Sequence, residues 1–274
     1  MNGFRPVTRA GSQMFDAVAA DPAGTLVVSD FDGTLAPIVS DPTKATVLPA
    51  ALNALERVGA LVGHVALITG RDVETVRRLG GFEGAGFARL RVLGQYGVES
   101  WDAATGEVHL PPEPPEVREL LRELPSLLND LGVHAEIEDK GRAVAVHTRN
   151  SPNPEATHLA LARPLRRMTE ARGLVLEAGR NVWEAKIGNA DKGKALDQLL
   201  TDPQISTVVM CGDDLGDIPA FRAVIAARER GLAGANVVAV SVEQPSVAEF
   251  ADVRCDGPAG VAAWLDALAD RLEA

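Results

Sequence analysis

The stretch Thr25-Leu26-Val27-Val28-Ser29-Asp30-Phe31-Asp32-Gly33-Thr34-Leu35 decides the fold class. Residues 25–29 are apolar or small on both faces, which is typical of a strand buried in a parallel sheet. Two carboxylates, Asp30 and Asp32, follow this strand at the edge where open parallel sheets bind their ligands. Carboxylate and carbonyl oxygens in such loops suit a hard cation such as Mg²⁺. An ordinary polar turn is the alternative for this stretch taken alone.

Three further apolar runs predict strands of the same sheet. They alternate with amphipathic stretches, and this order indicates an α/β fold, a Rossmann-like parallel sheet with helices on its faces. The predicted strands are 64–68, 207–211 and 236–240, and the predicted helices are 48–58, 72–79 and 261–272. Residues 1–23 have a weak helical pattern and are expected to precede this domain.

The middle of the chain predicts an inserted domain. It opens on Pro111-Pro112-Glu113-Pro114-Pro115, where proline prevents a helix or strand from continuing. A helix over 117–131, interrupted by Pro125, is followed by strands and a second helix, which together predict an antiparallel sheet backed by helices. We therefore expect an α+β domain at 110–188 between two halves of the parallel-sheet domain, 1–109 and 189–274. Residues 111–115 and 185–191 are the expected hinges.

Charge and composition restrict the class of protein. The 274 residues include 38 Asp and Glu against 27 Lys and Arg, which gives a net charge of −11. This acidic balance argues against a nucleic-acid partner, and no apolar run approaches the ~20 residues that span a membrane. Two cysteines and a start without an apolar signal segment favour a reducing cytoplasm. We expect a monomer or a weak oligomer.

Three further polar stretches follow predicted strands or begin predicted helices. Thr69-Gly70-Arg71 offers a hydroxyl and backbone N–H groups to a phosphate, although Thr-Gly is also an ordinary cap. Asp191-Lys192-Gly193-Lys194 offers a lysine that can neutralise phosphate, although such lysines are mostly solvated. Gly212-Asp213-Asp214-Leu215-Gly216-Asp217 brings three carboxylates together, and they repel one another unless a cation lies among them.

The order of these signals, DxDGT, then Thr, Lys and GDDxxD, resembles the haloacid dehalogenase-like superfamily of phosphotransferases. The inserted domain resembles that superfamily's larger α+β cap, the C2 type. The resemblance implies a Mg²⁺-dependent reaction through a phospho-aspartate, with Asp30 as nucleophile and metal ligand. Asp32 would be the general acid and base and would bind the metal through its backbone carbonyl. The other implied roles are phosphoryl binding by Thr69 and Lys192, metal binding by Asp213, and support of the metal shell or of Lys192 by Asp214 and Asp217.

Motifs in the inserted domain resemble those of trehalose-6-phosphate phosphatases. The matching stretches are Glu138-Asp139-Lys140-Gly141, His147-Thr148-Arg149, Gly179-Arg180-Asn181-Val182-Trp183-Glu184 and Lys192-Gly193. In the strand expected at 142–149, Val144 and Val146 point one way and the polar residues the other. Arg180 and Glu184 are expected on one side of a strand at 181–185. The resemblance implies that the sugar is bound by Lys140, His147, Arg149, Arg180 and Glu184, with Arg71 near the same opening.

This sequence departs from that family at several positions. Thr69 stands where Ser is commoner and Arg180 where Lys is commoner, so the hydroxyl and the charge are kept. Thr148 replaces an aromatic residue, and Gly216 and Ile218 replace the usual Thr and Glu. The expected activity is hydrolysis of trehalose 6-phosphate to trehalose and phosphate. Sucrose 6-phosphate and mannosyl-3-phosphoglycerate are the alternative substrates, and a non-catalytic sugar-phosphate-binding protein on the same fold is the alternative class.

Overall fold

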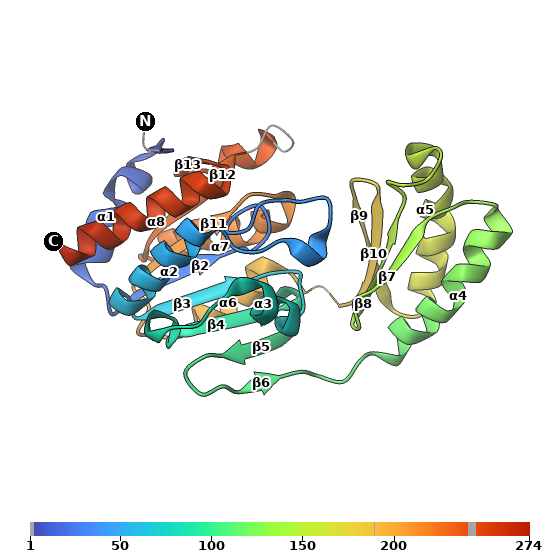
Figure 1. Ribbon diagram of the computed structural model, residues 1–274, viewed down its shortest axis with the longest axis horizontal. Coiled ribbons are helices and arrows are strands. Elements are labelled where there is room, and N and C mark those ends of the chain that lie inside the picture. Colours follow the sequence, from blue (N-terminus) through green and yellow to red (C-terminus); the bar gives the residue numbers. More distant parts are fainter. Residues whose placement is uncertain (1–2, 189, 241–244) are drawn as a thin grey trace. The chain divides into compact units, whose positions relative to one another are not determined.

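The chain folds into two compact units, which are described one at a time. The structure is a computed structural model that describes residues 3–188, 190–240 and 245–274. The core unit comprises Met1–Leu110 and Asp191–Ala274, and the second unit comprises Pro111–Ala190 (Figure 1). Asn189, which lies in the expected hinge at 185–191 and begins the expected second half of the core, is outside the described residues. The first residues of that expected hinge belong to a strand that ends at Ile187.

The core unit is built on a nine-stranded sheet in the order β1-β13-β12-β11-β2-β3-β4-β5-β6. The six strands from β13 to β4 run parallel, and β1, β5 and β6 pair antiparallel at the two edges. The strands are β1 (Phe4–Pro6), β2 (Thr25–Ser29), β3 (His64–Ile68), β4 (Leu90–Gly94), β5 (Glu99–Asp102), β6 (Val108–His109), β11 (Thr207–Gly212), β12 (Ala233–Val240) and β13 (Val253–Asp256). The expected mostly parallel α/β architecture is therefore confirmed.

Helices cover both faces of this sheet (Figure 1). One face packs on α1 (Arg9–Ala20), α2 (Pro49–Leu61), α3 (Val73–Gly80) and α8 (Gly257–Glu273), and the other on α6 (Lys192–Leu199) and α7 (Ile218–Glu229). Because helices lie on both faces, every residue of β2 and β11 is buried. None of the helices among the described residues is both long and apolar enough to cross a membrane.

The N-terminal residues dock on the core rather than extending from it. The helix in this region, α1, begins at Arg9 with Thr8 as its N-cap. Met14 and Val18 of α1 are buried in the core between the sheet and its helices. Strand β1 adds a second contact with the core, because it pairs with β13 at the edge of the sheet, with Phe4 opposite Cys255.

The second unit is a four-stranded antiparallel sheet with two helices on one face. The order is β7-β8-β10-β9, and α4 and α5 pack on the sheet through Val144, Val146 and the buried leucines of the helices. The elements are α4 (Pro115–Leu131), β7 (Glu136–Asp139), β8 (Ala143–His147), α5 (Pro154–Glu170), β9 (Leu174–Gly179) and β10 (Val182–Ile187). The expected interruption at Pro125 is wrong, since α4 is continuous through it. Leu120, Leu124 and Leu128 are buried at helical spacing on both sides of the proline, and this packing outweighs the lost hydrogen bond.

Candidate active site

The loop after β2 places two aspartates in different surroundings. Asp30 is buried, whereas the side chain of Asp32 is 38% exposed. Gly33 has a φ of +75°, which lets the chain reverse so that its N–H binds the carbonyl of Ala36 at 2.8 Å. A Cβ at this glycine would lie 2.1 Å from Oδ2 of Asp213. Gly33 therefore allows the loop after β2 to lie directly against the loop after β11.

The loop after β11 is organised by Asp217. Oδ2 of Asp217 accepts the backbone N–H groups of Asp213 at 2.9 Å and Asp214 at 3.1 Å. Asp213 in turn accepts the hydroxyl of Thr34 at 3.0 Å. These contacts satisfy the N–H groups of Asp213 and Asp214, which precede the 3₁₀ turn Leu215–Asp217, and fix the aspartates at the carboxyl end of the strand.

Lys192 joins these two loops. It is the first residue of α6, whose N-cap is Asp191, and its Nζ lies 2.8 Å from Oδ1 of Asp30 and 2.7 Å from Oδ1 of Asp217. Burial alone favours a neutral amine, but the carboxylates of Asp217 and Asp30 outweigh it and raise the pKa of Lys192 well above its ordinary value. Lys192 is therefore a fixed buried cation.

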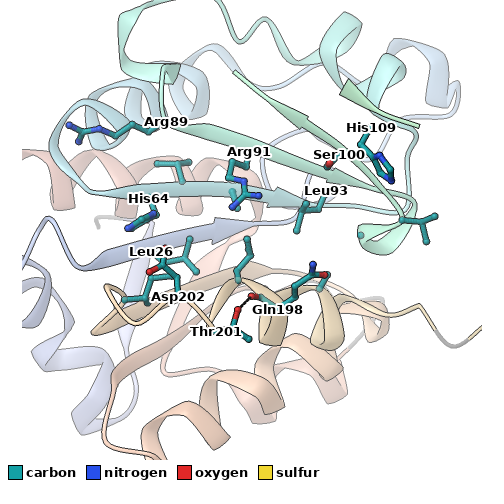
Figure 2. Close-up of a pocket in the computed structure, with 17 residues that line it drawn as sticks. Leu26, His64, Arg89, Arg91, Leu93, Ser100, His109, Gln198, Thr201 and Asp202 are labelled. Atoms are coloured by element: carbon teal, nitrogen blue, oxygen red, sulfur yellow. Dashed lines mark hydrogen bonds between the residues drawn. The ribbon is translucent and has the colours of Figure 1, made fainter. Parts of the chain in front are cut away.

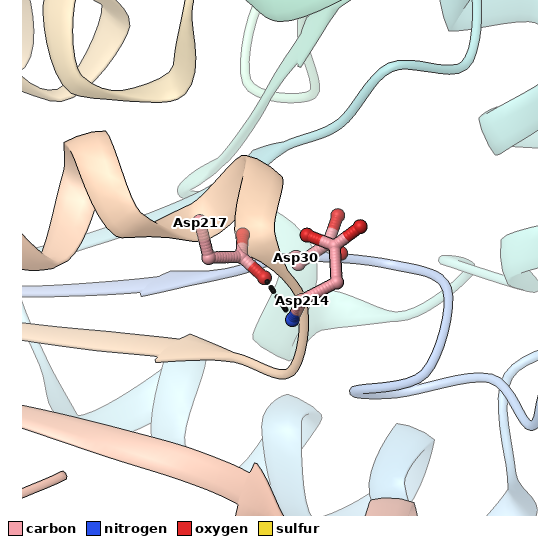
Figure 3. Close-up of side chains that lie close together, drawn as sticks. All are labelled: Asp30, Asp214 and Asp217. Atoms are coloured by element: carbon pink, nitrogen blue, oxygen red, sulfur yellow. Dashed lines mark hydrogen bonds between the residues drawn. The ribbon is translucent and has the colours of Figure 1, made fainter. Parts of the chain in front are cut away.

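An acidic cluster surrounds Lys192. Carboxylate oxygens of Asp30, Asp214 and Asp217 lie within 4.8 Å of one another (Figure 3). Burial, opposed by Lys192 and reinforced by the neighbouring aspartates, raises the pKa of Asp30 well above its usual range. One lysine thus leaves the cluster with excess negative charge. Oδ1 of Asp214 is also buried without a hydrogen-bond partner among the described residues, so the cluster could hold a metal ion.

Thr69 and Arg71 lie on the loop after β3. Thr69 is buried, and its hydroxyl oxygen accepts the N–H of Arg71 at 3.2 Å. The Arg71 guanidinium donates to both oxygens of Asp32, at 2.6 and 2.7 Å. The structure therefore places Arg71, which was expected near the sugar opening, in a bidentate ion pair with the expected general acid.

Several expected sugar-binding residues lie on or beside the face of the second unit's sheet that is opposite α4 and α5. Lys140 Nζ lies 2.6 Å from Oε2 of Glu184, and His147 Nε2 lies 2.8 Å from Oε2 of Glu138. Val144 and Val146 point into the core on the other face. Because residues alternate along a strand, this arrangement places His147 opposite those two valines, as expected.

Two of the expected sugar-binding residues lie outside regular strands. Arg149 is exposed in the segment that follows β8. Arg180 and Asn181 form the turn between β9 and β10, with Asn181 at a φ of +58°. The expectation that Arg180 shares a strand face with Glu184 is therefore wrong, because β10 begins at Val182. Asn tolerates this conformation, so the turn includes Asn181 and β10 begins one residue later than predicted.

A sequence model of the family described as trehalose-phosphatase matches residues 28–90 and 130–256. The chain belongs to the trehalose-phosphatase family. The matched ranges contain the acidic cluster, Lys192, Thr69 and the sheet of the second unit. The resemblance seen in the sequence is thus confirmed at the level of the family.

Two curated proteins and one solved structure illustrate what this chain is similar to. The trehalose-phosphate phosphatase of Mycobacterium tuberculosis is 32% identical over 271 residues, which are 93% of this chain and 63% of that protein. An uncharacterized glycosyl hydrolase of the same species is 33% identical over 260 residues, which are 90% of this chain and 18% of that protein. This chain therefore spans less than two thirds of either relative. The solved C-terminal domain of C. albicans trehalose-6-phosphate phosphatase has a TM-score of 0.76 at 18% identity and covers 97% of this chain and 98% of that domain, so the two share a fold.

A turn that the sequence did not reveal supports the Thr69–Arg71 loop. Gln95 and Tyr96 have φ values of +48° and +60°, a conformation that costs a non-glycine residue about 1–2 kcal/mol. Their N–H groups bind the carbonyls of Arg71 and Thr69, each at 2.9 Å. In the sequence, only the glycines on either side, Gly94 and Gly97, indicated a turn at Gln95-Tyr96. Through these two backbone hydrogen bonds, the turn fixes the position of the Thr69–Arg71 loop.

The metal-free protein is expected to lose stability as the pH rises from about 4 to about 7. Burial, together with Asp217 and Asp214, raises the pKa of Asp213 from 3.8 to about 7. The folded state thus binds this proton more tightly than the unfolded state does, and the advantage disappears as the pH passes through that range. We expect the wild-type free energy of unfolding, relative to Asp213→Asn, to fall by on the order of 2–4 kcal/mol.

Urea denaturation in EDTA at several pH values measures this change, and a relative stability that is constant or rising with pH contradicts it. Saturating MgCl₂ provides the control. A bound divalent cation favours the carboxylate form and should make the decline in wild-type stability smaller.

Proposed function

We propose that this protein is a phosphatase that hydrolyses trehalose 6-phosphate to trehalose and phosphate. The observation that carries the proposal is the buried Asp30 carboxylate, 2.8 Å from Lys192 and inside an acidic cluster, in a chain of the trehalose-phosphatase family. A carboxylate and a phosphate repel each other, and attack requires cations that cancel this repulsion. Lys192 supplies one of them.

Phosphoryl transfer uses residues of the core unit. An oxygen of Asp30 attacks phosphorus, the bond from phosphorus to the sugar oxygen breaks, and the leaving oxygen takes a proton from Asp32. Water then attacks the phosphorus of the aspartyl phosphate and gives a proton to Asp32, while the bond from phosphorus to the Asp30 oxygen breaks, which releases phosphate and restores the Asp30 carboxylate. Thr69 and Lys192 hold the phosphoryl oxygens in this scheme. Both oxygens of Asp32 accept hydrogen bonds from Arg71 in the structure, so one of these bonds must open when Asp32 carries its proton.

The donor set suits Mg²⁺ as the cofactor. The carboxylates of Asp30 and Asp213 and the backbone carbonyl of Asp32 would hold the ion, because Asp217 is already occupied by Lys192 and by two backbone N–H groups. Asp214 would adjoin this set with its unpaired oxygen. When bound, Mg²⁺ neutralises charge on the phosphate and on Asp30.

The second unit would act as the cap that selects the sugar. Lys140, His147, Arg149, Arg180 and Glu184 would bind the disaccharide, since carboxylates accept and cations donate hydrogen bonds to hydroxyls. The pairing of Lys140 with Glu184 supports a shared polar surface on the sheet. Both cysteines are free and buried, which supports a reducing, cytoplasmic location. We further propose that the chain acts as a monomer or a weak oligomer, without nucleic-acid or membrane partners.

Phosphate release from a panel of sugar phosphates tests the function. Trehalose 6-phosphate should be hydrolysed faster than sucrose 6-phosphate, mannosyl-3-phosphoglycerate and glucose 6-phosphate. EDTA should stop the reaction and added Mg²⁺ should restore it. Equal rates for trehalose 6-phosphate and glucose 6-phosphate would exclude the proposed substrate. No release from any sugar phosphate, with saturable binding of one, would favour the non-catalytic alternative.

A Glu184→Gln substitution should weaken substrate binding more than it slows chemistry. Loss of the charge removes hydrogen bonds worth about 1.5–3 kcal/mol, so we expect KM for trehalose 6-phosphate to rise about 10- to 100-fold with a much smaller change in kcat. Steady-state kinetics measure both constants. Hydrolysis of p-nitrophenyl phosphate, which has no sugar, should be unchanged, and Glu155→Gln on the exposed side of α5 is the matched control. An unchanged KM for trehalose 6-phosphate would remove Glu184 from the sugar site.

A further inference from the structure

A pocket of about 440 Å³ lies entirely within the core unit, between strands β3–β6 and helix α6 (Figure 2). Apolar side chains such as Ala66 and Leu93 form part of its lining, and Gln198 and Leu199 of α6 form the opposite side. The core beneath α6 and α7 includes Leu93 of β4 and, among the described residues, none from β5 or β6. This end of the sheet face is therefore open to a ligand.

Strand alternation brings polar side chains into the pocket. Leu90 and Val92 of β4 are buried in the core on the other face of the sheet, so Arg91 between them points to the pocket side. The register pairs Leu93 with Ser100, and Ser100 with His109. Ser100 on β5 and His109 on the edge strand β6 therefore extend the polar side of the pocket toward the edge of the sheet.

The polar lining is cationic although the whole chain has a net charge of −11. The charged or titratable residues among the described lining are Arg89, Arg91, His64, His109 and Asp202. Figure 2 shows Arg91 pointing between the sheet and α6, with His64 and His109 on either side. The local charge thus favours an anion over a cation.

Nearby carboxylates leave much of this charge available. Oδ1 of Asp202 accepts the backbone N–H of Gln204 at 2.9 Å. The Arg91 guanidinium approaches one carboxylate among the described residues, that of Asp102, and their separation of 3.8 Å is too long for a hydrogen bond. Arg91 can therefore present its planar set of N–H donors to a carboxylate or a phosphate group.

We propose that this pocket binds a small organic anion that also carries hydroxyl groups. Its carboxylate or phosphate group lies on Arg91 between His64 and His109, and its hydroxyls bind Ser100 and Gln198. Such an occupant contacts α6, the helix that begins at Lys192, because Ala195 and Leu199 also line the pocket. Ligand contact should therefore protect the amides of α6 from exchange.

The site can be tested without measuring phosphatase activity. Citrate supplies hydroxyl and carboxylate groups, and 3-phosphoglycerate adds a phosphate, so the two probes distinguish the sources of the anionic group. Each is titrated into the full chain while NMR follows the ring signals of His64 and His109, with choline chloride at matched ionic strength as the control. We expect saturable shifts of both rings with at least one organic anion and none with choline, and slower amide exchange in α6.

Matched variants decide whether the ligand sits in this pocket. Arg91→Gln should weaken the binding at least tenfold, and Gln198→Glu, which adds a negative charge on exposed α6, should do the same. Arg78→Gln, exposed on α3 at the other face of the sheet, should leave binding within twofold. The proposal is overturned if neither anion shifts the two rings saturably, or if the shifts persist unchanged in Arg91→Gln and Gln198→Glu.

Discussion

Asp30→Asn is expected to lower kcat for trehalose 6-phosphate by about 10⁴-fold or more, the size of effect seen when a catalytic nucleophile is removed. The amide has nearly the same shape but cannot form the bond to phosphorus. Asp30 is buried beside Lys192, so the substitution removes the attacking oxygen from its place next to that cation. Steady-state phosphate release measures the loss.

The matched control for this prediction is Asp197→Asn. Asp197 is an exposed aspartate of α6, the helix that begins with Lys192, and its substitution should leave kcat within about twofold because it touches no part of the acidic cluster. Circular dichroism should show that both variants are folded. An Asp30→Asn enzyme that keeps more than about a tenth of its kcat contradicts the assignment of the nucleophile.

Lys192→Met is expected to impair both catalysis and folding. Lys192 Nζ lies within 2.8 Å of two buried carboxylates, and removing the cation leaves them uncompensated. We expect kcat to fall by about 10²–10³-fold, because a preorganised charge is lost from the transition state. The free energy of unfolding should fall by about 3–5 kcal/mol, as is typical when one partner of a buried ion pair is removed.

The loss of stability in Lys192→Met should depend on pH. Burial already raises the pKa of Asp30 above its unfolded value of 3.8 despite the opposing effect of Lys192, and without the lysine the pKa rises further. A raised folded-state pKa means that stability falls as the pH rises above about 4, so the deficit should be larger at pH 8 than at pH 5. Urea denaturation at the two pH values measures it.

Lys194→Met is the control for the lysine. Its side chain is 61% exposed on the same helix, and its loss should change the stability by no more than about 0.5 kcal/mol. A Lys192→Met protein that is as stable as the wild type at both pH values would show that the buried cation does not hold the two loops together.

The sequence predicted best those elements whose signal is contained in their own residues. Strands β2 and β3 have the predicted bounds, and β11 extends the prediction by one residue, because continuous apolar runs are typical of strands buried on both faces. Strands β4, β5 and β13 were not predicted, and the short edge strands β1 and β6 were missed as well. Both residues of β6 are exposed, and its pairing depends on β5 rather than on a pattern of its own.

The same distinction applies to the site. Asp30, Lys192, Asp214 and Asp217 could be named from their motifs, and the fold brings them together. The pairing of Arg71 with Asp32 could not be read from the sequence, because the loops after β2 and β3 meet only in the folded sheet. The left-handed turn at Gln95 and Tyr96 was also missed, because neither residue type indicates a positive φ.

Trapping the phosphorylated enzyme tests the central claim most directly. The wild-type protein is mixed with trehalose 6-phosphate and Mg²⁺, quenched in acid within its first turnover and reduced with borohydride, which converts an aspartyl phosphate to a stable alcohol that peptide mass spectrometry can locate. We predict modification at Asp30 alone, dependent on substrate and absent from Asp30→Asn. Modification at another residue, or full turnover with none at Asp30, would contradict the account.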